Sequence, residues 1–242
     1  MIKKLALPLL LLTGLLAAVE SGTSPEARKV GWVETVELDL QGWTVHADAR
    51  LVNGEYRELG TRVLSMLDNH LERISILMPE KQLAGLRKME ILIEHSHPEL
   101  TAMQYHPGAA WLNERGYDPR LLKKVHIPQA GALVSRNQML KHPAVILHEL
   151  AHAYHDQVLG FDEPEIIRAY DDAMKKGIYE KILLFNGDTV RHYATTNHKE
   201  YFAEATEAYL YHNDFYPFVR AELRLHDPAM FGIMEKTWGK TD

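Results

Sequence analysis

The chain has 242 residues, of which 46% are hydrophobic, and its formal net charge is −6. This length and composition allow one sizeable core, and the absence of a long basic run argues against binding to nucleic acid. Cysteine is absent, which excludes disulfide bonds and a lipid anchor attached at a cysteine.

The N-terminus has the pattern of a secretory signal peptide. Lys3 and Lys4 precede the apolar run Leu5–Val19, which is shorter than the roughly 20 residues that span a bilayer. We expect cleavage between Ala18 and Ser24; the alternative is an uncleaved N-terminal anchor. The expected organisation is therefore a signal peptide over residues 1–22 and a single domain over residues 23–242, secreted or periplasmic and free of the membrane after cleavage.

The first half of the domain reads as short strands and helices. Polar and apolar residues alternate from 32 to 48 around Gln41 and Gly42, which predicts a hairpin. The breakers between residues 95 and 120 predict a loop. Apolar spacing and stop signals predict helices at 56–78 and 81–87, a buried strand at 89–94 and a short edge strand at Val125–Ile127.

The second half reads as mostly helical. Pro143 suits a first helical position and Gly160 a helix end, so one helix is predicted between them. Further helices are predicted at 164–176, 178–184, 198–211 and 216–238, with a loop at 185–197. The predicted fold class is α+β: a small mixed sheet over the Pro143–Gly160 helix, with a mostly helical C-terminal part.

That helix carries an HExxH motif made by His148, Glu149 and His152. The two histidines are four residues apart, so both imidazoles can reach one ion from the same helix face. Glu149 is rotated by about a third of a turn, close enough to hold a water on that ion without being a ligand. This arrangement is typical of zinc hydrolases and predicts one Zn2+ per chain; the alternative is a helix whose histidines are ordinary surface or capping groups.

A catalytic zinc needs a third protein ligand and an open position. Glu200, Glu204 and Glu207 lie on the helix predicted at 198–211. Glu200 and Glu204 share one face, and the aromatic residues around them indicate partial burial. Either of the two could be the third ligand, with the other hydrogen-bonded to a ligand or to a buried partner. We expect Glu207 to be solvated.

Four other histidines need a separate interpretation. His155 shares a helix face with His148 but lies about 10 Å further along the axis, so we expect it either to support a ligand or to be solvated. His70 is predicted at the edge of the core. His95 and His97 are predicted to be a solvated loop pair, because no carboxylate or thiol cluster accompanies them in the sequence.

The sequence resembles the catalytic domain of anthrax lethal factor and its relatives in its HExxH motif, in Tyr193 and in the EYFAE segment 200–204. Those relatives include small secreted bacterial endopeptidases that cut at proline-rich sites. By that resemblance Glu200 is the third zinc ligand and Tyr193, seven positions earlier, stabilises the oxyanion. The likeness covers two blocks and not the N-terminal half. The whole chain is also similar to a group of bacterial metallopeptidases that share YHP, WL and NDFYPFVR stretches.

The sequence thus predicts a monomeric zincin-like metalloendopeptidase that acts on a peptide or protein substrate. Glu149 would take a proton from the zinc-activated water and pass it to the leaving amine. A peptide would bind as an added strand along Val125–Ile127. Two alternatives remain: a zinc-binding or protein-binding module of the same fold without turnover, and a structural zinc site with a fourth protein ligand, such as His155 or Glu204, in place of water.

Overall fold

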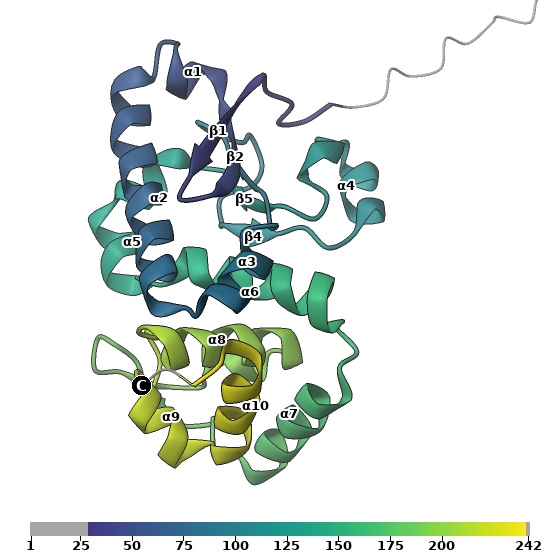
Figure 1. Cartoon of the computed structure of the whole chain (residues 1–242), viewed down its shortest axis with the longest axis vertical. Coiled ribbons are helices and arrows are strands. Elements are labelled where there is room, and N and C mark those ends of the chain that lie inside the picture. The colour runs from purple at the N-terminus through teal and green to yellow at the C-terminus, as the bar shows by residue number, and fades with distance from the viewer. Residues whose placement is uncertain (1–28, 241–242) are drawn as a thin grey trace, which may run out of the picture.

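The computed structural model describes residues 29–240, and their architecture is mixed α+β, as predicted. The predicted signal peptide lies outside these residues. The sheet and its covering helices form the upper part of Figure 1, and the C-terminal helices form the lower part. None of the helices in this part of the chain has the length and apolar character that crossing a bilayer requires.

The sheet has five strands in the order β1-β2-β3-β5-β4. Their bounds are β1 Thr35–Leu40, β2 Trp43–Asp48, β3 Ile91–Ile93, β4 Gln104–Tyr105 and β5 Val125–Ile127. β1 and β2 form the predicted hairpin, which turns at Gln41 and Gly42, both with positive φ. β2, β3 and β5 are parallel, and β4 pairs antiparallel with β5. The prediction that Val125–Ile127 is an edge strand is wrong, because β4 covers its outer side.

The helices confirm most of the predicted segments. They are α1 Ala49–Val52, α2 Arg57–Leu77, α3 Glu80–Leu86, α4 Ala109–Arg115, α5 Arg136–Lys141, α6 Val145–Tyr154, α7 Pro164–Lys176, α8 His198–Leu210, α9 Arg220–His226 and α10 Pro228–Trp238. α6 begins two residues after Pro143, which therefore is not its first residue, and one π-helical turn, His155–Leu159, extends it to Gly160.

Two predictions of local structure are wrong. Residues 95–120 are not all loop, since they contain β4 and α4. Residues 178–184 are not a helix: Gly177, at φ 67°, ends α7, and β6 (Ile182–Leu183) then pairs with β7 (Thr189–Val190). Gly187, at φ 96°, lies in the connection between these two strands. The positive φ values at the two glycines favour termination and reversal over a continued helix.

Helix α6 lies between the sheet and the C-terminal helices. One face of the sheet, including Val45, Ile91 and Val125, belongs to the main hydrophobic core that α2 and α6 share. On its other side α6 packs against α8, which lies directly below it in Figure 1. Every residue of α6 except His152 and Tyr154 is buried. A polar side chain on this helix is therefore enclosed between two layers, where it needs partners.

Candidate metal centre

Two helices bring three donor atoms together at the contact between α6 and α8. His148 and His152 lie one turn apart on α6, as their spacing predicts. Glu200 lies in the first turn of α8, where the side chain of Asn197 caps the helix by accepting hydrogen bonds from the backbone N–H groups of Lys199 and Glu200. The cap fixes the start of α8 and with it the position of the Glu200 carboxylate.

The donor atoms form a nearly equilateral triangle. His148 Nε2 lies 3.2 Å from Glu200 Oε2, His152 Nε2 lies 3.1 Å from the same oxygen, and the two Nε2 atoms are 3.1 Å apart. Ligand atoms around a tetrahedral zinc, with bonds of about 2.0–2.1 Å, lie roughly 3.3 Å apart. The triangle is therefore close in size to one face of such a tetrahedron.

A positive charge is needed where the three donor atoms meet. His148 Nδ1 lies 2.6 Å from Glu207 Oε1, and since a carboxylate only accepts, Nδ1 carries a proton. Nε2 of a neutral His148 would then be a lone pair that faces a carboxylate oxygen and a second imidazole nitrogen. A second proton on His148 removes this repulsion: burial opposes it, but the hydrogen bonds to Glu200 and Glu207 outweigh burial and raise the pKa of His148 well above its ordinary value. A cation held by all three atoms would supply the same positive charge, and two imidazoles with one carboxylate are a donor set that zinc takes in catalytic sites.

Electrostatics at Glu200 agree with this arrangement. Burial by itself would raise the pKa of the Glu200 carboxyl, but its contacts with His148 and His152 outweigh burial and hold that pKa well below the ordinary value. The carboxylate is thus ionised and able to bind a cation. In the part of the chain that the structure describes, no further His, Asp or Glu donor joins the three, so the geometry favours three protein ligands over the four of a closed structural site.

Glu149 is buried beside the two histidines and faces β4, one of the two edge strands of the sheet. Its Oε2 accepts a hydrogen bond of 2.9 Å from the backbone N–H of Tyr105. The backbone groups of His106, which follows β4, bond to Lys123 and Lys124, which precede β5, so the alternation of an antiparallel pair turns the Tyr105 N–H away from β5. Burial raises the pKa of Glu149. The carboxylate is therefore held in one orientation and has an increased affinity for a proton.

Tyr193 begins a short 3₁₀ turn just before α8, and its side chain is about half exposed. Partial burial, followed by the negative charge of Glu200, raises the pKa of the Tyr193 phenol. The phenol is therefore protonated at neutral pH and can donate a hydrogen bond.

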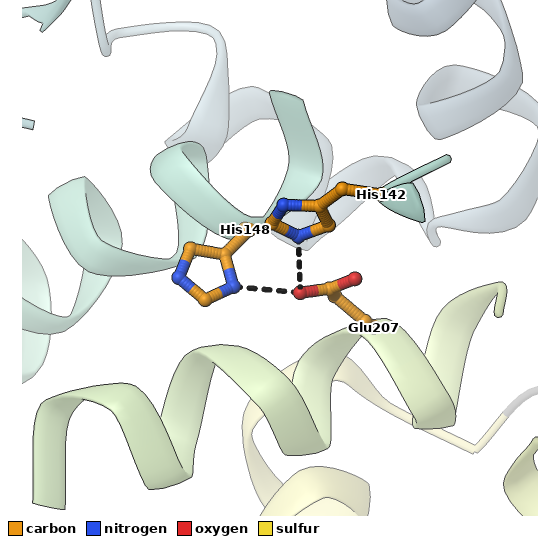
Figure 2. A group of neighbouring side chains, drawn as sticks. All are labelled: His142, His148 and Glu207. Carbon is orange, nitrogen blue, oxygen red and sulfur yellow. Dashed lines mark hydrogen bonds and ion pairs between the residues drawn. The ribbon is translucent and has the colours of Figure 1, made fainter. Parts of the chain in front are cut away.

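The prediction for Glu207 is wrong. Its side chain is fully buried, and one oxygen, Oε1, lies 2.6 Å from His148 Nδ1 and 3.0 Å from His142 Nε2 (Figure 2). Glu204, expected as a ligand or as a support, lies 3.8 Å from His148 Nδ1, and its Oε2 accepts instead from Asn213 Nδ2 at 2.9 Å. Sequence reasoning missed His142 entirely, because it precedes α6 and belongs to no recognisable motif.

The remaining predicted histidines lie outside the triangle. His155 is fully buried against Phe161 and Phe202, so the alternative that it is solvated is wrong, and no residue within 29–240 hydrogen-bonds to either ring nitrogen. His70 is buried, as predicted, and burial lowers its pKa to about 4. His97 is also buried, contrary to the prediction of a solvated loop pair.

No protein-family model matches this chain, and no curated protein matches it either. Among solved structures it is similar to the Pro-Pro endopeptidase PPEP-2 from Paenibacillus alvei, with 21% identity over 82% of this chain and 99% of that chain and a TM-score of 0.44. An identity and a TM-score this low do not establish a shared activity.

Proposed function

We propose that this chain is an exported, zinc-dependent endopeptidase of the zincin type. His148, His152 and Glu200 would hold the metal, and Glu149 would be the general base. The observation that carries the proposal is the triangle of donor atoms on α6 and α8, with sides of 3.1–3.2 Å. Export is supported by the N-terminal sequence, Lys3 and Lys4 before an apolar run.

The residues around the triangle suit peptide hydrolysis. Zinc, when bound, would polarise the scissile carbonyl and make a water more acidic. Glu149, adjacent to His148 and fixed by the Tyr105 N–H, would take the proton from that water and return it to the leaving amine. The Tyr193 phenol would donate a hydrogen bond to the negative charge that develops on the carbonyl oxygen.

The edge of β4 offers a binding mode for the substrate. β4 lies at one edge of the sheet, and the backbone N–H of Tyr105 on its outer side bonds to Glu149. An extended peptide that pairs with the remaining backbone groups of this edge would pass the triangle, so β4 takes the role that was predicted for Val125–Ile127. Main-chain pairing does not depend on a free terminus, which favours cleavage inside a chain over removal of terminal residues.

Digestion of a peptide library by the purified protein tests the proposal. We expect internal cleavage that a chelator stops and that added zinc restores, read by mass spectrometry. If the protein binds zinc stoichiometrically but cuts no peptide in the library, the alternative of a binding module without turnover is correct. Cleavage that persists unchanged in chelator would rule out the metal.

Tyr193→Phe tests the oxyanion role in the same assay. A hydrogen bond made only in the transition state affects kcat and leaves substrate binding nearly unchanged. Loss of one such donor typically costs about 10²–10³ in kcat, so we expect a fall of that order with little change in KM or zinc content. A variant with near wild-type turnover on one good substrate would show that Tyr193 only packs.

A further inference from the structure

The other ring nitrogen of His148, Nδ1, is not part of the triangle and contacts Glu207, which His142 also contacts. Glu207 Oε1 accepts from His148 Nδ1 and from His142 Nε2, and the three residues come from α8, from α6 and from the residue that follows α5 (Figure 2). We propose that Glu207 and His142 are a positioning pair that fixes the tautomer and ring orientation of His148. The inference rests on the proposed metal centre.

The same three residues do not fit a second metal ion. Their donor atoms lie within 4.8 Å of one another, but the 2.6 Å between His148 Nδ1 and Glu207 Oε1 is a hydrogen-bond distance. Two ligands of one tetrahedral zinc would lie roughly 3.3 Å apart. A shared carboxylate oxygen with two imidazole donors is instead the arrangement that orients a metal-binding histidine.

Glu207 fits this role better than Glu204, although both are buried on α8. Glu207 Oε1 lies 2.6 Å from His148 Nδ1, whereas Glu204 Oε1 lies 3.8 Å from that atom, beyond hydrogen-bond distance. The other Glu204 oxygen, Oε2, accepts a hydrogen bond of 2.9 Å from Asn213 Nδ2. Glu207 is therefore the carboxylate that holds the ligand imidazole.

His142 gives Glu207 its second hydrogen bond. Its ring packs edge-to-face on His148, with centroids 5.2 Å apart, and its side chain is 22% exposed while that of Glu207 is fully buried. A buried carboxylate with a single partner would have more freedom to rotate. His142 therefore acts on His148 through Glu207, and removing it should matter only while Glu207 is present.

The test measures the zinc dissociation constant by competition with a chelator, for variants that retain the wild-type circular dichroism spectrum. Glu207→Ala should weaken binding by about 10–100-fold, the usual cost of losing an outer partner of a ligand. His142→Ala should weaken binding less, and His142→Gln, which keeps an N–H donor near the position of Nε2, should restore most of the loss. The double variant should match Glu207→Ala, because residues that act as a unit are not additive.

Two control variants on α8 separate positioning from packing. Glu204→Gln keeps the side-chain shape and should leave zinc affinity nearly unchanged, and Thr206→Ala removes buried contacts to Trp238 without touching His148. Proton–nitrogen correlation spectra of the histidine side chains supply a second readout. We expect the wild-type His148 proton on Nδ1 and, in the near-isosteric Glu207→Gln, a shifted and broadened signal, which a packing change elsewhere on α8 would not cause.

Each contrary result identifies which claim fails. If the wild type binds no zinc, the proposed metal centre is wrong. If the wild type binds zinc and Glu207→Ala or Glu207→Gln binds it within about threefold as well, the metal centre stands and the positioning pair is wrong. If the fold-losses of zinc affinity in the two single variants multiply in the double variant, His142 does not act through Glu207. If Glu204→Gln loses more zinc affinity than Glu207→Ala, the positioning role belongs to Glu204.

Discussion

Replacing Glu149 by Gln should lower the rate of peptide cleavage by about 10²–10⁴ while leaving zinc content and fold intact. The amide oxygen of Gln can still accept the hydrogen bond that the Tyr105 N–H donates to Glu149, so the side chain keeps its place. An amide cannot take up a proton at neutral pH, however, and loss of a general base costs about 10²–10⁴ in rate. We therefore expect kcat to fall by that factor in a fluorogenic peptide assay.

Glu149→Asp is the matched control for this change. It keeps a carboxylate but withdraws it by one methylene, so some base function should survive at reduced rate. Zinc content, measured by elemental analysis, should equal that of the wild type in both variants, because Glu149 contributes no atom to the triangle of donors. Near wild-type turnover in Glu149→Gln would remove Glu149 from the mechanism.

The elements that the sequence predicts correctly are those with strong local signals. The hairpin turn at Gln41-Gly42, the long periodic helix α2 and the helix α8 all follow from spacing and turn residues. The errors lie where tertiary contacts decide. β4 has only two residues and exists because it pairs with β5, and the β6–β7 pair likewise depends on partners that no local pattern shows.

The residues of the site divide in the same way, into those that local spacing predicts and those that only tertiary contacts bring together. His148 and His152 are linked by helix geometry, so spacing alone places them together. Glu207 looks like a surface residue because its partners lie 59 and 65 residues away along the chain, in His148 and His142. A clue was available in the sequence: α8 carries aromatic and small residues on several sides, which indicates a helix buried all round. A glutamate on such a helix needs a partner.

Removing any one of the three donors should abolish stoichiometric zinc binding. His148→Ala, His152→Ala and Glu200→Ala each leave two of the three donor atoms that form the triangle, fewer than the three protein ligands of a catalytic zinc. Zinc that binds only the folded state at about 100 times its dissociation constant adds about 2.7 kcal/mol of stability. For a domain of this size that corresponds to a rise in Tm of about 5–10 °C.

We therefore expect zinc to raise the Tm of the wild type by that amount and a chelator to reverse the rise, whereas the three variants should not respond to either. His95→Ala is a suitable control, since His95 stacks on Tyr56 outside the site, and its Tm should respond to zinc as in the wild type. The Tm shift reports binding without activity, so it tests the donors even if no substrate is found. A full zinc response in both His148→Ala and His152→Ala would mean that the ion binds elsewhere and that the triangle is not its site.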